Sequence, residues 1–145
     1  CDMDGVLCDF KKGYKELTGI EIKGHIVIQD WSDVDSHPSF WSDLDWMPDG
    51  KQLWGYIAKY KPSILSSPSA SSTAPAQKIK WLRRLPNKKQ VFFAQKDDKQ
   101  KWAGPKNILI DDMKETVDQW INAGGIGVWH TNAANTIKQL KQLGL

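Results

Sequence analysis

The stretch CDMDGVLCDF, residues 1–10, decides how the rest of the chain is interpreted. Asp2 and Asp4 flank a single residue, and Gly5 follows them directly. Two carboxylates this close repel each other unless a cation lies near them. Gly5 allows the chain to turn tightly straight after the pair. The stretch therefore predicts a cation site, for which other parts of the chain must supply further ligands.

Two more apolar runs also end in polar side chains. SILSS, residues 63–67, ends in Ser66 and Ser67, and NILIDD, residues 107–112, ends in Asp111 and Asp112. Each run has the length and composition of a short buried strand. Ligands of parallel sheets bind at the carboxyl ends of the strands. We therefore expect four carboxylates and two hydroxyls to meet at one edge of a sheet.

Amphipathic helices are expected between the strands. The apolar spacing predicts helices within residues 49–60, 78–85, 115–123 and 132–143, and further strands within 90–95 and 126–130. In the second helix we expect Ile79, Leu82 and Leu85 to face inward. Strands alternating with helices predict right-handed βαβ units, and hence a three-layer α/β/α core with a Rossmann-like parallel sheet.

Residues 19–47 do not follow this alternation. They contain HIVIQDW, HPSFW and DLDWMP, which are rich in aromatic residues and have no clear period. We interpret them as a small cap-like insertion over the strand ends. The length of 145 residues favours one domain over residues 1–145 that carries this insertion.

Composition excludes several classes of protein. No apolar run is long enough to cross a membrane, and no signal peptide is visible. Cys1 and Cys8 are too few for a disulfide framework, so we expect reduced thiols and a cytoplasmic setting. A net charge of +3 does not by itself imply a nucleic-acid partner. A strand is expected before the first acidic pair, yet only Cys1 precedes Asp2, so we expect residues to be missing there.

Mg²⁺ is the cation that best fits the acidic strand ends. It is a hard ion that prefers oxygen and is often held by one or two carboxylates with waters and a phosphate oxygen. A calcium-binding EF-hand loop is the competing interpretation of DMDG. Such a loop needs a bidentate Glu at its twelfth position, where this chain has Gly13, so we reject it.

The order of these motifs resembles the haloacid dehalogenase-like (HAD) phosphohydrolases. The family has a strand followed by Asp-x-Asp-Gly, a strand ending in Ser or Thr, a lysine, and a strand ending in acidic residues. The matching stretches here are DMDG, SILS and NILIDD, in that order. DMDGVLCDF, ILSSP and ILIDD followed by GG are most similar to the 5'(3')-deoxyribonucleotidases and their bacterial and phage relatives.

This resemblance implies an aspartyl-phosphate mechanism. Asp2 would be the nucleophile, and Asp4 the general acid and then the general base. Asp2, Asp111 and the backbone carbonyl of Asp4 would hold Mg²⁺. Asp112 would lie behind them and orient a water molecule or the lysine. The implied fold is the Rossmann-like HAD core with a small cap.

The resemblance also implies a phosphate-binding set. Ser66 and the backbone of Ser67 would bind a phosphoryl oxygen. The motif lysine could be Lys96, Lys99 or Lys101, and similarity to the Asp-Lys pair of the family favours Lys99, which would neutralise charge on the phosphoryl oxygens. The alternative is that KDDKQK is a solvated charged loop. Lys78 matches a second lysine of the nucleotidases.

Aromatic residues near the first motif and in the insertion are candidates for substrate contact. Such rings could stack on a base while the phosphate occupies the metal site. The alternative is a small hydrophobic core of the cap with no base specificity. For Phe10 the resemblance favours substrate contact, whereas both interpretations stay open for the rest. The candidates are Phe10, Trp31, Phe40, Trp41 and Trp46.

Three functions were weighed. The first is a Mg²⁺-dependent phosphomonoesterase acting on nucleoside monophosphates, or more generally on small phosphate esters. The second is a nucleic-acid-end (3'-phosphate) phosphatase, which the basic residues within 78–89 would support, although we favour a solvated helix face there and expect no nucleic-acid partner. A binding protein without activity is disfavoured because clustered carboxylates are costly. The oligomeric state is left open, with a homodimer as one option.

Overall fold

The strands of this protein are short, parallel and arranged in two pairs. The computed structural model describes all 145 residues. Strand β1 (Ile64–Ser66) pairs with β2 (Val91–Phe93), and β3 (Ile108–Asp111) pairs with β4 (Ile126–Trp129). In the second pair Asp111 lies opposite Trp129, so both strands end at the same level. The predicted mixed α/β class with parallel pairing is therefore observed.

The first residues of the chain lie between the two sheets. The backbone N–H of Leu65 in β1 donates to the carbonyl of Cys1, at 2.9 Å. The N–H of Asp2 donates to the carbonyl of Ile110 in β3, at 2.8 Å. The amino-terminal nitrogen of Cys1 also donates to the carbonyl of Ser63, at 3.0 Å. This segment connects β1 with β3, but three bonds are too few to define a strand. The predicted three-layer core with one continuous sheet is thus observed only in part, as two sheets bridged by residues 1–2.

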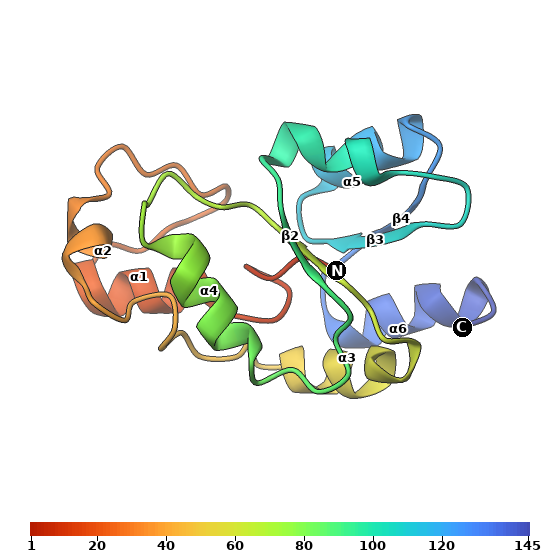
Figure 1. Cartoon of the computed structure of the whole chain (residues 1–145), viewed down its shortest axis with the longest axis horizontal. Helices are drawn as coiled ribbons and strands as arrows, with labels where there is room; N and C mark the ends of the chain where they lie inside the picture. The colour runs from red at the N-terminus through yellow and green to blue at the C-terminus, as the bar shows by residue number, and fades with distance from the viewer.

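Helices cover both sides of β3 and β4. Figure 1 shows α5 (Lys114–Asn122) on one side of these strands, and α3 (Gly50–Ile57) and α6 (Ala133–Gln142) on the other. Helix α6 begins where expected, because the side chain of Asn132 accepts a hydrogen bond from the N–H of Asn135. The short 3₁₀ helices η1 (Ala58–Tyr60) and η2 (Lys96–Trp102) follow α3 and β2. None of the helices combines the length and the apolar character that crossing a membrane requires.

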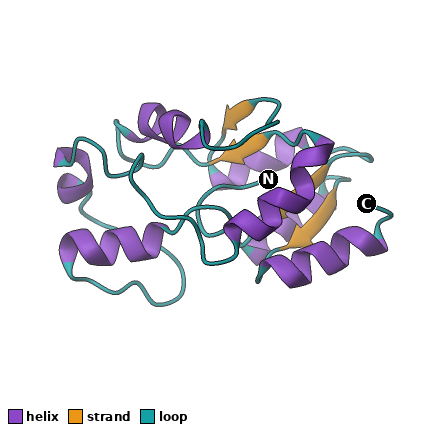
Figure 2. Ribbon diagram, turned by 90° about the horizontal axis from the view of Figure 1, so that it is seen from below, coloured by secondary structure: helices purple, strands orange, loops and turns teal.

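The insertion lies at one end of the molecule. Figures 1 and 2 place α1 (Phe10–Thr18) and α2 (Ser32–Ser36) at the end away from β3 and β4. Apart from α2, residues 19–47 form no helix or strand, which agrees with their irregular sequence. A single core of 23 buried residues nevertheless runs from Val34 and Trp41 in the insertion to Ile64 and Ile110 in the strands.

Helix α4 (Ala74–Leu82) ties the insertion to the strands. The indole N–H of Trp81 and the guanidinium of Arg84 both donate to the carbonyl of Leu44, and Gln77 accepts from the N–H of Trp41. The predicted inward face of this helix is wrong at Ile79, which is 46% exposed. Lys78 and Trp81 face inward instead, because α4 packs on a polar site as well as on the core.

Candidate functional site

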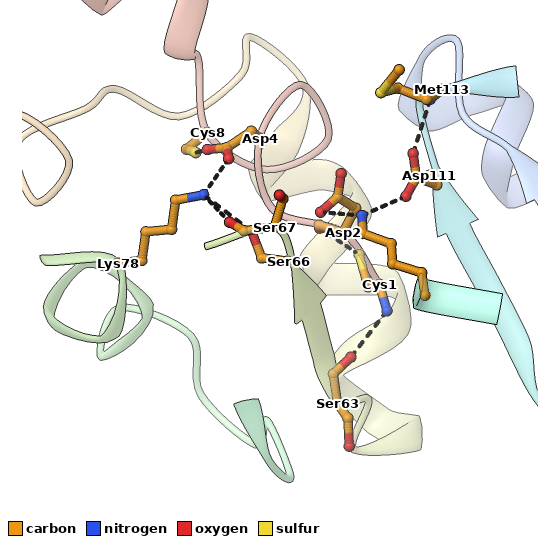
Figure 3. Close-up of polar contacts among 11 residues, drawn as sticks. Cys1, Asp2, Asp4, Cys8, Ser63, Ser66, Ser67, Lys78, Asp111 and Met113 are labelled. Atoms are coloured by element: carbon orange, nitrogen blue, oxygen red, sulfur yellow. Dashed lines mark hydrogen bonds and ion pairs between the residues drawn. The ribbon is translucent and has the colours of Figure 1, made fainter. Parts of the chain in front are cut away.

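Three carboxylates gather at the carboxyl end of β3. Oxygen atoms of Asp2, Asp111 and Asp112 lie within 4.8 Å of one another. Asp2 is brought there by its backbone bond to Ile110, and Asp111 is the last residue of β3. Figure 3 shows Asp2 and Asp111 pointing toward each other from the two segments. The predicted meeting of acids from the first and last motifs is therefore present in the structure.

Lys99 lies between two of these acids. Its ammonium group is 3.0 Å from Asp2 Oδ1 and 2.7 Å from Asp111 Oδ2, and its side chain is almost fully buried. The other two candidates for the motif lysine point elsewhere. Lys96 pairs with Glu115 and Lys101 with Asp98, and both side chains are at least half exposed. Among the three lysines, only Lys99 reaches the acidic group.

Backbone contacts fix the positions of the acids. The second oxygen of Asp111 accepts a hydrogen bond from the N–H of Met113, at 2.9 Å. Gly5 has a positive φ of 77°, and a Cβ atom there would lie 2.4 Å from Asp112 Oδ2. Glycine is thus required twice, for the turn and for the close approach of Asp112. The sequence indicated the turn but not this contact.

The charge of the group is only partly balanced. Burial, with the nearby charges of Asp111 and Asp4, raises the pKa of Asp2 to about 6, although Lys99 opposes the shift. Burial and the charges of Asp2 and Asp111 raise the pKa of Asp112 to about 7. Burial lowers the pKa of Lys99, but its ion pairs with Asp2 and Asp111 outweigh this and leave it raised. Such excess negative charge among oxygen donors suits a hard divalent cation.

Asp4 lies beside the group in a different environment. Its Oδ2 is 2.6 Å from the ammonium of Lys78, which also donates to the carbonyl of Ser67 at 2.7 Å and to Ser66 Oγ at 3.3 Å (Figure 3). Its Oδ1 accepts a hydrogen bond from the thiol of Cys8, at 3.1 Å. The two acids of the first motif therefore have different partners, since Asp2 pairs with the buried Lys99 and Asp4 with the buried Lys78.

The phosphate-binding candidates lie around these lysines. Ser66 is fully buried at the end of β1, and Ser67 follows it. Both contact Lys78 from α4, whose side chain is 1% exposed. Sequence reasoning included Lys78 only through a resemblance, because the spacing of its helix did not show that it faces inward. It missed Cys8 altogether, because a single thiol in the sequence carries no signal of a contact with Asp4.

The candidate aromatic residues separate into two places. Phe10 lies 5.1 Å from Trp41, 5.7 Å from Phe40 and 6.1 Å from Trp31, measured between ring centroids. The ammonium of Lys78 lies 4.6 Å from the centroid of the Trp41 ring, so this cluster adjoins the polar site. Trp46 packs on Trp81 instead, at 4.9 Å. Only Trp31 and Trp46 of the five are partly exposed, and substrate contact stays a prediction for all of them.

The main cavities do not coincide with the acidic group. One of about 250 Å³ lies between helix α1 and the insertion, against Gly13, Leu17, Phe40 and Leu44. A larger one of about 590 Å³ lies around the amino ends of β1 and β3 and is mostly apolar. Comparison with known proteins adds nothing to the geometry, because no protein-family model and no curated protein matches the chain.

The ion pair of Asp4 with Lys78 can be tested through stability. Asp4→Asn leaves Lys78 buried with no acid in pairing distance, because Asp4 is its only ion-pair partner. We expect the free energy of unfolding to fall by about 3 kcal/mol, as when one partner of a buried pair is removed. Urea denaturation measures this loss. The matched control is Asp45→Asn, which breaks the exposed pair with Lys12 and should change stability little. Equal effects of the two variants would contradict the structural role of the buried pair.

Proposed function

We propose that this protein is a Mg²⁺-dependent phosphomonoesterase that works through an aspartyl-phosphate on Asp2. One observation carries the proposal: Asp2, Asp111 and Asp112 converge at the end of β3, with Lys99 between the first two, and a fourth acid, Asp4, lies beside them with its own partners. A scaffold without a ligand gains nothing from burying the carboxylates of Asp2 and Asp111 beside a third, that of Asp112. The motif order that resembles the HAD phosphohydrolases supports the same conclusion.

Asp2 is the group that attacks phosphorus. Its side chain is 10% exposed, and with a pKa of about 6 it is mostly ionised at neutral pH. A carboxylate oxygen of Asp2 forms a bond to phosphorus while the bond to the leaving oxygen breaks. Asp2, Asp111 and the Asp4 carbonyl would hold Mg²⁺. This ion and the ammonium of Lys99 would offset negative charge on the phosphoryl oxygens. Asp112, close behind them, would orient a water molecule.

Asp4 handles the proton. It gives a proton to the leaving oxygen and later removes one from the water that attacks the aspartyl-phosphate, which releases inorganic phosphate and restores Asp2. Asp4 suits this role because it lies next to Asp2 in sequence but does not share its cluster. Ser66, the Ser67 backbone and Lys78 lie beside Asp4 and would hold the remaining phosphoryl oxygens.

We further propose a nucleoside monophosphate as the substrate, with a deoxyribonucleotide as the preferred class. The support is the aromatic cluster of Phe10, Trp31, Phe40 and Trp41, which adjoins Lys78 and could stack on a base. A nucleic-acid-end phosphatase has less support. Lys78 is buried in the site and Arg84 donates to backbone carbonyls of the insertion, so these two basic residues already have partners within the protein.

The nucleophile is tested with Asp2→Asn. The amide has nearly the same size but cannot attack phosphorus, so we expect turnover to be lost while the fold is kept. Phosphate release from dUMP in the presence of Mg²⁺ measures this, and circular dichroism checks the fold. Asp118→Asn is the matched control, because Asp118 is an exposed acid on α5 that pairs only with Lys114. Wild-type rates in the Asp2→Asn variant would rule out the covalent mechanism.

The metal site is tested by thermal unfolding. Mg²⁺ should bind the folded carboxylate group and not the unfolded chain, and at about 100 times its Kd it adds about 2.7 kcal/mol of stability. We expect the melting temperature to rise by several degrees in millimolar Mg²⁺ and to return when a chelator is added. The rise should be absent in Asp111→Asn. A rise that sodium chloride reproduces at equal ionic strength would indicate screening rather than a site.

The base contact is tested at Trp31, the partly exposed member of the aromatic cluster. We expect Trp31→Leu to lower kcat/KM for dUMP by an amount equivalent to roughly 1–3 kcal/mol, the range for one lost base stack. Hydrolysis of p-nitrophenyl phosphate should change little, because its ring lacks a nucleoside that reaches the insertion. Trp102→Leu is the control, since Trp102 is an exposed tryptophan outside the insertion and packs on Phe92. Equal losses with both substrates would mean that Trp31 only packs the insertion.

A further inference from the structure

The contact between Cys8 and Asp4 is a feature that the proposed mechanism does not yet use. Cys8 lies on the loop that follows the first motif and is 0% exposed. Its Sγ lies 3.1 Å from Asp4 Oδ1, whereas Lys78 contacts the other oxygen of this carboxylate, Oδ2 (Figure 3). We propose that the Cys8 thiol is a positioning residue that sets the orientation of the Asp4 carboxylate for proton transfer, an inference that rests on the proposed phosphatase function.

The backbone holds the two residues in a fixed relation. The N–H of Cys8 donates to the carbonyl of Met3, at 3.0 Å, and the N–H of Gly5 donates to the carbonyl of Cys8, at 2.9 Å. Cys8 also forms isolated β-bridges with Asp4 and with Trp46. The backbone of Cys8 is therefore held against that of Asp4 by the loop. Only rotation about χ1 of Cys8 is left to place the thiol, and the side chain is fully buried.

The thiol is suited to act as a neutral donor. Its Sγ lies within hydrogen-bond distance of Asp4 Oδ1, and the residue is fully buried. It can then donate to Asp4 Oδ1 without adding a negative charge to a crowded acidic site. With Lys78 on Oδ2, each oxygen of Asp4 has one donor, and the plane of the carboxylate is fixed from two sides. Without Cys8, the contact with Lys78 alone leaves that plane free to rotate.

A positioning role makes a specific prediction about leaving groups. The alkoxide that leaves dUMP is a strong base and needs a proton from Asp4 as its bond to phosphorus breaks. The p-nitrophenolate ion is a weak base and leaves without one. Since kcat/KM covers only the steps up to formation of the aspartyl-phosphate, it isolates this first proton transfer from the later hydrolysis by water. Loss of the thiol should therefore lower kcat/KM for dUMP and spare p-nitrophenyl phosphate.

The experiment compares three variants with the wild type, on both substrates and in Mg²⁺. For Cys8→Ala we expect kcat/KM for dUMP to fall about tenfold, a part of what general acid catalysis contributes, with less than a twofold change for p-nitrophenyl phosphate. Cys8→Ser keeps a donor and should restore most of the activity on dUMP. Val6→Ala is the control for packing, because Val6 is also 0% exposed on the same loop but apolar, and it should affect both substrates alike.

The possible outcomes separate the two proposals. A selective loss on dUMP that Cys8→Ser rescues supports the positioning role. Equal losses on both substrates, or no loss in a folded Cys8→Ala protein, overturn it while the phosphatase function stands. If Cys8→Ala does not fold, Cys8→Val fills the space without a hydrogen-bond donor. It is then judged by the same comparison, the ratio of kcat/KM for dUMP to kcat/KM for p-nitrophenyl phosphate. If the wild type hydrolyses neither substrate, the proposed function fails and the positioning role fails with it.

Discussion

Repulsion between carboxylates at one edge of the sheet is the constraint on which the rest of the structure depends. Asp2 and Asp111 reach the same place because the first residues of the chain lie between β1 and β3. Lys99 makes this tolerable by contacting both, at 3.0 and 2.7 Å. Burying the charged side chain of Lys99, which is 4% exposed, carries a desolvation cost. Neither the acids nor this ammonium would therefore be stable there alone. The group forms only as a whole, which ties η2 and β3 to the amino-terminal segment.

Helix α4 extends this dependence to the insertion. Lys78 projects from α4 to Asp4, while Gln77, Trp81 and Arg84 of the same helix and its end bind backbone atoms of residues 41–44. The ring of Trp41 then lies against the ammonium of Lys78, which stabilises a cation that has little water around it. Helix α4 therefore contacts both Asp4 and the insertion. The site and the insertion are joined through this helix, although they are separate segments of the sequence.

Sequence reasoning found what depends on pattern and missed what depends on packing. Strand ends carry Asp111 and Ser66 as predicted, because short apolar runs followed by polar residues are visible in the sequence. The exposure of Ile79 and the burial of Lys78 were not visible in the sequence. The spacing of apolar residues alone cannot show that a helix packs on a polar site. The continuous sheet was not found, since residues 1–2 make only two bonds to residues 63–65 and one to β3. Cys8 could not be found at all without the fold of its loop.

The charge that is left over gives the strongest reason to expect a further cation. Three carboxylates against one ammonium leave two negative charges when all the groups are ionised, that is, −3 and +1. Burial first, and then the neighbouring carboxylates, raise the pKa of Asp2 to about 6 and that of Asp112 to about 7. Uptake of protons near neutral pH is one way to reduce the excess charge. A divalent cation would relieve it without protons, and would leave Asp2 ionised, which is the state that a nucleophile requires.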